Sequence, residues 1–240
     1  MLTSINKLSE DIQNQIIEAY RNNMSLREIE KQFGATRATV SKFLEKQGIK
    51  TTKGNHYRKY FHDIAFFEDI NTEEKAYWLG FMYADGYIVN NENRYGEDCF
   101  GITLAEDSID SIQKFKSSLK ATNPIRYDDS KNGQRQAKLV CCSQKTVNDL
   151  INQGVFKEKS LILKPPERVP EELIRHFIRG FFDGDGSLTK SHSNNYISYG
   201  INFTTTYDMA KWLLDIFQMG NIFPDKRREH TWYFSLGGNK

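Results

Sequence analysis

The stretch Trp78–Gly86 reads WLGFMYADG, and the same pattern returns as IRGFFDGDG at Ile178–Gly186. In both copies an apolar segment runs into an Asp-Gly pair, at Asp85-Gly86 and again at Asp185-Gly186. A single Asp-Gly pair after an apolar helix fits an ordinary helix C-terminus. Two copies, one domain length apart, indicate instead that one structural unit has been duplicated.

The residues before each Asp-Gly pair predict a helix. Thr72 can cap a helix from Glu73 to about Ala84, and Pro170 can open one that runs through Phe182. Glycine inside a helix costs about 1 kcal/mol relative to alanine. Both helices nevertheless carry small residues at matching places, and these are Gly80, Ala84, Gly180 and Gly184. We therefore expect the two small-residue faces to pack together and to bring the two aspartates close to each other.

The segments after the two helices also repeat. Each copy continues with strand-like segments, a further helix and a second pair of strands, and Asn132-Gly133 is a strong hairpin signal. The predicted fold class is α+β, with two αββαββα units related by a pseudo-twofold axis. The predicted domains are residues 67–160 for the first unit and residues 161–240 for the second. The second unit stops at SLGGNK without a counterpart of the first unit's last helix, so we expect it to be C-terminally incomplete.

The first 49 residues predict a separate three-helix bundle with helix-turn-helix architecture, followed by a basic linker over residues 50–66. Residues 1–60 contain 11 Lys and Arg but 6 Asp and Glu, although the whole chain has a net charge of only +2. A local basic excess together with this architecture favours binding to double-stranded DNA over a solvated bundle face. The residues expected to meet DNA on the last helix are Thr36, Arg37, Ala38, Ser41 and Lys42.

The two motifs resemble the signature segments of LAGLIDADG homing endonucleases, and the resemblance covers roughly residues 61–240. It implies a saddle of two four-stranded sheets over DNA and a monomer that acts as a pseudo-dimer. It further implies that Asp85 and Asp185, with Gly86 and Gly186 beside them, hold Mg²⁺ or Mn²⁺ at the scissile phosphates. Lys159 matches a basic residue that supports the site, although an ordinary exposed lysine is as compatible with the sequence.

The resemblance implies a metal-dependent, site-specific DNA endonuclease that promotes the mobility of an intron or of its own gene. A non-cleaving DNA-binding regulator and an RNA maturase on the same scaffold remain open alternatives. Other basic residues are expected either to contact DNA or to form solvated surface, and these are Arg58, Arg94, Arg126, Lys131, Arg135, Lys190, Arg227 and Arg228.

Composition excludes several other classes of protein. No apolar run approaches the length of about 20 residues that spans a bilayer, so no membrane association is expected. The N-terminus lacks a signal pattern, which predicts a cytoplasmic protein. The resemblance to homing endonucleases implies a phage or bacterial host. The three cysteines are Cys99, Cys141 and Cys142, and their odd number with two adjacent members argues against a disulfide framework. No Cys-x-x-Cys pair occurs, which argues against a structural zinc site. Cys141 and Cys142 are expected to lie on a strand as small packing residues.

Overall fold

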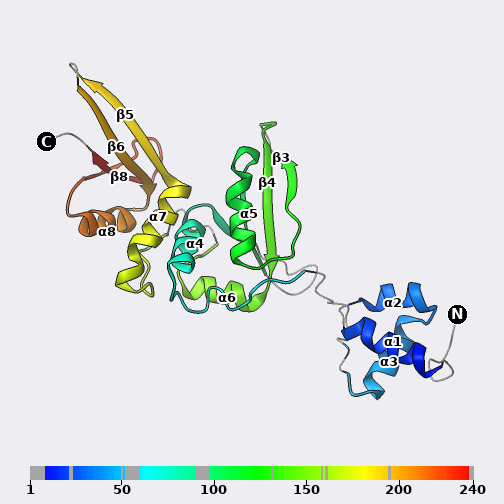
Figure 1. Ribbon diagram of the computed structural model, residues 1–240. Coiled ribbons are helices and arrows are strands. Elements are labelled where there is room, and N and C mark those ends of the chain that lie inside the picture. Colours follow the sequence, from blue (N-terminus) through cyan, green and yellow to red (C-terminus); the bar gives the residue numbers. More distant parts are fainter. Residues whose placement is uncertain are drawn as a thin grey trace. The chain divides into compact units, whose positions relative to one another are not determined.

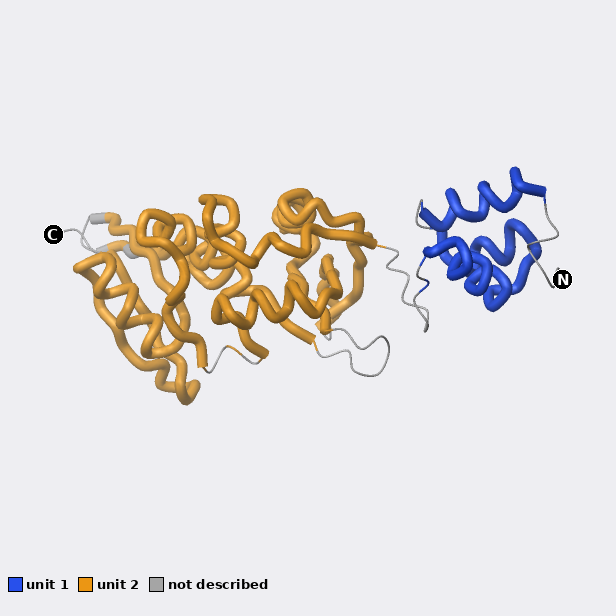
Figure 2. Tube along the Cα trace, turned by 90° about the horizontal axis from the view of Figure 1, so that it is seen from below, with its two compact units in different colours: residues 1–59 blue, residues 60–240 orange. Residues whose placement is uncertain are grey.

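The structure is a computed structural model, which places residues 9–21, 24–49, 51, 60–89, 98–130, 132–157, 159, 162–193 and 196–237. The chain divides into two compact units, Met1–Lys59 and Tyr60–Lys240 (Figure 2). Within these described ranges, no helix is both long enough and apolar enough to cross a membrane.

The N-terminal unit contains three helices, α1 (Glu10–Arg21), α2 (Leu26–Phe33) and α3 (Arg37–Lys46). Ser25 and Glu28 form a capping box at the start of α2. Gly34 ends α2 in the left-handed region at φ 72°, and Thr36 then caps α3. The buried side chains of this unit form a core of their own, and they include Ile16, Ile29, Val40, Phe43 and Leu44.

The C-terminal unit is built around two helices, α4 (Glu73–Ala84) and α7 (Ile174–Asp185), which pack against each other (Figure 1). The Thr72 side chain accepts a hydrogen bond from the Lys75 amide and caps α4, as predicted. Pro170 precedes a short 3-10 helix (Glu171–Leu173) that leads into α7. Both helices therefore begin close to the positions that the sequence predicts.

Each of these helices leads directly into a four-stranded antiparallel sheet. The strands of the first sheet are β1 (Gly86–Val89), β2 (Cys99–Ala105), β3 (Arg126–Asp129) and β4 (Arg135–Cys142). The strands of the second are β5 (Gly186–Ser193), β6 (Tyr196–Thr205), β7 (Asn221–Pro224) and β8 (Trp232–Gly237). The strand orders are β1-β2-β4-β3 and β5-β6-β8-β7, so both sheets have the same topology, and the predicted duplicated α+β fold is confirmed.

Helices cover one face of each sheet. In the first half these are α5 (Ile109–Ser118), which packs against β2 and β4, and α6 (Gln144–Asn152), which packs against β2. In the second half α8 (Tyr207–Phe217) packs against β6, β7 and β8. The side chains on the covered faces form one continuous core with α4 and α7, and Phe100, Leu139, Phe203 and Phe234 belong to it.

The two covered faces are not buried to the same extent. Ile88 on β1 and Leu188 on β5 hold equivalent positions three residues after the motif aspartates. Ile88 is 7% exposed, whereas Leu188 is 76% exposed. No counterpart of α6 occurs among the described residues of the second half.

The cysteines differ from the sequence-based expectation. Cys99 and Cys142 lie directly opposite each other on β2 and β4 and form a disulfide bond, so the prediction that they would not pair was wrong. The prediction failed because the spacing of the cysteines along the chain does not reveal the register of two strands that are 43 residues apart. Cys141 is free and buried in the core, as the predicted packing role requires.

Candidate functional site

The candidate site lies where α4 and α7 end side by side, and four helix residues without large side chains make this possible. A Cβ atom on Gly80 would overlap the Phe177 carbonyl oxygen, and a Cβ atom on Gly180 would overlap the Tyr77 carbonyl oxygen. Near the ends of the helices, a Cβ atom on Gly184 would collide with the Cβ atom of Ala84. The two backbones are thus in direct contact, which only glycine permits at these positions.

The motif aspartates stand at the transition from helix to strand. Asp85 caps α4 and donates its amide to the Phe81 carbonyl at 3.0 Å, and β1 begins at the next residue. Asp185 is the last residue of α7, and β5 begins at Gly186. After each aspartate the backbone folds back against the last turn of the preceding helix. A side chain on Gly86 would therefore clash with Met82, and a side chain on Gly186 would clash with Phe182.

The two aspartates come close to each other. The Asp85 carboxylate lies against the backbone of Gly184, where its Oδ2 atom is 3.3 Å from the point that a Cβ atom on Gly184 would occupy. The charge of Asp85 is also strong enough at Asp185 to raise the pKa of that carboxyl. The structure therefore brings together the two carboxyl groups that the motif repeat predicted to converge.

Lys159 reaches the same place from the segment after α6. It is only 8% exposed, and its Nζ atom donates to the carbonyl oxygens of Ala84 at 2.6 Å and of Gly86 at 2.5 Å. These carbonyl groups flank Asp85 on both sides. Lys159 is consequently a buried lysine held at the end of α4, and it is not an ordinary surface lysine.

Burial and neighbouring charges set the protonation of this trio. Burial raises the pKa of both Asp85 and Asp185, and the proximity of Asp85 contributes further at Asp185, where the pKa rises to about 6. The ammonium group of Lys159 opposes both increases. Burial lowers the pKa of Lys159, while the two carboxylates, and first of all Asp185, act in the opposite direction. The three groups therefore share one electrostatic environment.

The donor set is compatible with a hard divalent cation. Mg²⁺ is commonly held by one or two carboxylates while waters and substrate phosphates fill its other positions. Asp85 and Asp185 supply two such carboxylates, and a cation between them would relieve the repulsion that raises the pKa of Asp185. Among the described residues, no cluster of three or more His, Cys, Asp or Glu side chains offers an alternative metal site. The carbonyl oxygen of Gly86 is already engaged by Lys159.

Each sheet also presents a polar face, opposite the face that the helices cover. The alternation of side chains along a strand locates this face. Ala137 and Leu139 of β4 are buried, so Lys138 between them points the other way. On the first sheet the polar face includes Tyr87, Thr103, Arg126, Gln136 and Lys138, together with Asp128, which forms an ion pair with Lys138. On the second sheet it comprises Ser187, Thr189, Asn202, Thr204 and Ser235. The sequence motifs do not mark most of these residues, although the period of two in the strands is the signal that locates them.

The residues predicted to contact DNA fall into several groups. On α3, Ala38 and Lys42 are exposed, Arg37 is exposed and pairs with Glu30, and Ser41 bonds to Thr51. Arg126 lies on the polar face of the first sheet. Arg227 and Arg228 lie in the exposed turn between β7 and β8, where the amide of Arg227 donates to Asp225.

Two other basic residues lie on the helix-covered faces. Arg135 pairs with Glu106 and stacks over Tyr127, and Lys190 lies over the ring of Tyr199, which is exposed. Their strand positions place them opposite the polar faces. Arg58, Arg94 and Lys131 lie outside the described residues.

Comparison with known proteins identifies the architecture. No protein-family model matches the sequence, and no curated protein matches it. Among solved structures, the I-LtrWI LAGLIDADG homing endonuclease bound to target DNA superposes with a TM-score of 0.50 at 12% identity, over 73% of this chain and 80% of that one. Meganuclease I-SmaMI bound to uncleaveable DNA superposes with a TM-score of 0.48 at 14% identity, over 67% and 78% of the two chains. The C-terminal unit of this protein therefore has the fold of the LAGLIDADG homing endonucleases.

Proposed function

We propose that this protein is a site-specific endonuclease that hydrolyses double-stranded DNA with the help of divalent metal ions. The observation that carries the proposal is the meeting of Asp85, Asp185 and Lys159 at the paired ends of α4 and α7. The fold of this unit is shared with a homing endonuclease that was crystallised on its target DNA, which supports the same substrate here.

Each member of the trio has a distinct task in this proposal. Asp85 and Asp185 would hold Mg²⁺ or Mn²⁺, and the bound metal would supply a nucleophilic water and offset charge on the phosphate oxygens. Lys159 lowers the pKa of both aspartates and so favours their ionised, metal-binding forms. Its positive charge would also offset negative charge on a phosphate bound beside the two aspartates.

The polar faces of the two sheets are the proposed DNA-contacting surfaces. A two-stranded ribbon fits the major groove, and hydroxyl, amide and basic side chains can read base edges there. The first face carries Arg126 and the ion pair between Lys138 and Asp128, whereas the described residues of the second face are uncharged. The two halves of a bound DNA site would thus contact surfaces with different side chains, which suits a target sequence that is not a palindrome.

The N-terminal unit is proposed to add a second DNA contact through α3. Its exposed residues Arg37, Ala38 and Lys42 include both small and basic side chains, which suits close approach to a groove and to phosphates. Tethering two binding units raises the effective concentration of each at the DNA.

Selection of cleaved duplexes from a randomised double-stranded library, with Mg²⁺ present, tests the proposal. We expect the wild-type protein to enrich one asymmetric site. On that site, Asp85→Asn and Asp185→Asn should each lower the cleavage rate by about 10²-fold or more while leaving binding in gel-shift assays nearly unchanged. If no duplex is cut, while a parallel selection for bound duplexes enriches one site, the protein is instead a non-cleaving regulator. Normal cutting by both variants would refute the assigned roles.

A further inference from the structure

The two motif copies differ two residues before the aspartate, where the first has Tyr83 and the second has Asp183. Both positions face the opposite helix. The ring of Tyr83 packs edge-on against Phe177 with 4.8 Å between ring centroids, while Asp183 accepts a hydrogen bond from the Tyr77 hydroxyl at 2.8 Å. The helix pair thus accommodates either residue type, so helix packing alone does not account for a tyrosine at position 83.

The hydroxyl group of Tyr83 has a partner outside the helix pair. Tyr83 is only 2% exposed, and its hydroxyl donates to the Gln153 carbonyl oxygen at 2.7 Å. Burial, with a smaller contribution from Glu167, raises the pKa of Tyr83, so the hydroxyl remains a donor. Gly154 comes next with φ at 94°, and any side chain there would overlap the Tyr83 hydroxyl. The turn that leaves α6 is therefore fitted against this one group.

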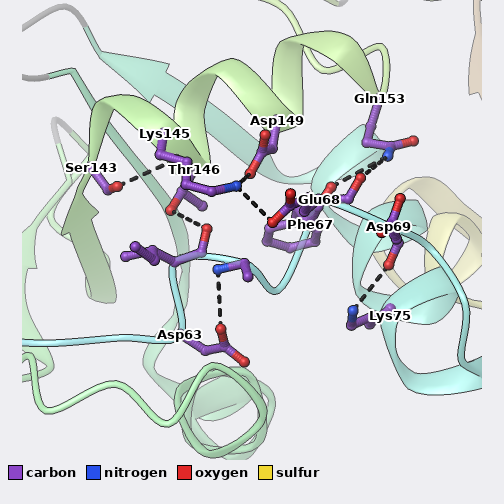
Figure 3. A network of polar contacts seen from close by, with 12 residues as sticks. Asp63, Phe67, Glu68, Asp69, Lys75, Ser143, Lys145, Thr146, Asp149 and Gln153 are labelled. Atoms are coloured by element: carbon purple, nitrogen blue, oxygen red, sulfur yellow. Dashed lines mark hydrogen bonds and ion pairs between the residues drawn. The ribbon is translucent and has the colours of Figure 1, made fainter.

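The same turn is held from its other side. The Gln153 side-chain Nε2 atom donates to the carbonyl oxygens of Phe67 and Glu68, at 3.3 and 3.1 Å (Figure 3). Lys145, near the start of α6, bonds to both Glu68 and Asp149 at 2.9 Å. These contacts fasten α6 to the segment that precedes α4, and the Tyr83 hydroxyl adds a hydrogen bond between the turn and α4 itself.

The chain that leaves this turn carries Lys159. Val155 is fully buried, and five residues after Gly154 the Lys159 ammonium group reaches the carbonyl oxygens of Ala84 and Gly86. Tyr83 is the residue immediately before Ala84. The segment from Gln153 to Lys159 is therefore attached to the end of α4 at both of its ends, by the Tyr83 hydroxyl at one and by Lys159 itself at the other.

We propose that Tyr83 is a positioning residue, which acts through the turn at Gln153-Gly154 to hold Lys159 beside Asp85 and Asp185. A lysine that is 8% exposed must give up hydration, and it stays in place only while its hydrogen-bond acceptors remain aligned. In the second motif, Asp183 bonds across the helix pair and braces no such segment among the described residues. The consequence for catalysis rests on the proposed endonuclease function, whereas the consequence for the placement of Lys159 does not.

The structural part of the inference is tested by the chemical reactivity of Lys159. Brief treatment of the folded, metal-free protein with an amine-acylating reagent, followed by peptide mass spectrometry, gives the rate for each lysine. We expect Tyr83→Phe to accelerate acylation of Lys159 by about five- to tenfold, the effect of losing one hydrogen bond of ordinary net strength. The matched control is Tyr77→Phe, which also removes one hydroxyl from α4 and should leave Lys159 as protected as in the wild type. Exposed Lys42 and Lys211 serve as internal standards.

Two results would overturn this part. One is an unchanged Lys159 rate in Tyr83→Phe, and the other is an equal acceleration at Lys138 and Lys145, which would reveal general loosening of the fold.

The catalytic part is tested by a double-mutant cycle on the selected DNA site. Tyr83→Phe should lower the cleavage rate by about five- to tenfold without changing DNA affinity. In a Lys159→Ala background it should cause no further loss, because its effect passes through the lysine. Independent, multiplicative losses would overturn the proposed route. If the wild-type protein cuts no duplex at all, the endonuclease proposal fails, while the acylation rates still decide whether Tyr83 positions Lys159.

Discussion

At the scale of single residues, the site is a place where the fold holds like charges close together. Part of the Asp185 residue remains in contact with solvent, but the protein atoms packed around its carboxyl group, together with the charge of Asp85, raise its pKa to about 6 from an ordinary value of 3.8. A native state that binds a proton more tightly than the unfolded state becomes less stable as pH rises toward that pKa. Without metal, the ionised form of Asp185 therefore destabilises the native protein above pH 6.

Replacing this charge should stabilise the metal-free protein in a pH-dependent manner. At pH 8 we expect Asp185→Asn to raise the free energy of unfolding by about 1 kcal/mol, since solvent screening reduces the effect at an exposed group. That increase corresponds to roughly 2–4 °C in melting temperature for a unit of this size. The gain should shrink progressively as pH falls below 6 toward 4, because the wild-type carboxyl is then protonated in the native state.

Thermal melts at several pH values, with a chelator present, measure this directly. Asp183 lies on the same helix, and Asp183→Asn provides the control, for which no increase in melting temperature is expected. Addition of Mg²⁺ should stabilise the wild-type protein and not Asp185→Asn, because a ligand that binds only the native state shifts its stability. A lower melting temperature for Asp185→Asn at pH 8 would contradict this account of the site.

At the scale of helices and strands, the contact between α4 and α7 determines whether the site exists. Gly80 and Gly180 each face the backbone of the opposite helix with no space for a methyl group. We expect Gly80→Ala to lower the free energy of unfolding by about 3 kcal/mol, which is the upper end of the usual cost of overpacking a core. The cost is high because the added methyl group would meet backbone atoms of Phe177 and Phe181, which cannot rotate away. Chemical denaturation measures the change.

Gly133→Ala is the matched control for this substitution. Gly133 has open space around its Cβ position but a positive φ of 77°, so the expected loss there is only about 1 kcal/mol. Equal losses at Gly80 and Gly133 would mean that the helices do not approach as closely as described.

A second comparison between elements concerns the covered faces of the sheets. Ile88→Ala should lower the free energy of unfolding by about 2–4 kcal/mol, as expected for a buried aliphatic side chain. Leu188→Ala, at the equivalent position of the second sheet, should change it by no more than about 0.5 kcal/mol, because that side chain is already exposed to water. Similar losses at the two positions would indicate that another part of the protein covers Leu188.

The sequence predicted those features that local patterns encode. The repeated motif predicted α4, α7 and the glycine contact, and the repeat of the following segments predicted the same order of strands and helices along both halves. The sequence did not predict the Cys99–Cys142 disulfide bond or the pairing of Arg135 with Glu106, because both contacts depend on strand register. The bond from Tyr83 to Gln153 joins residues 70 positions apart, and no local pattern marks such a contact.

At the scale of the whole molecule, the chain combines two units with separate cores. The proposed DNA contacts of the N-terminal unit are then electrostatic contributions that add to those of the sheets. Each lysine or arginine that neutralises a phosphate releases counterions, so the logarithm of affinity falls with the logarithm of salt concentration by about 0.9 per contact. The number of phosphate contacts made by α3 can therefore be counted by titration.

We expect the double variant Arg37→Ala/Lys42→Ala to bind the selected DNA site more weakly and to reduce the salt slope by about 2, because two phosphate contacts are lost. Both side chains are exposed, so the fold of the three-helix unit should be retained, which circular dichroism can verify. Lys211→Ala removes an exposed lysine from α8, on the covered side of the second sheet, and should leave the slope unchanged. Affinity measured by fluorescence anisotropy between 50 and 300 mM salt, roughly the range in which the effect is large, separates the outcomes. An unchanged slope in the double variant would show that α3 makes no phosphate contacts, and binding would then rest on the C-terminal unit alone.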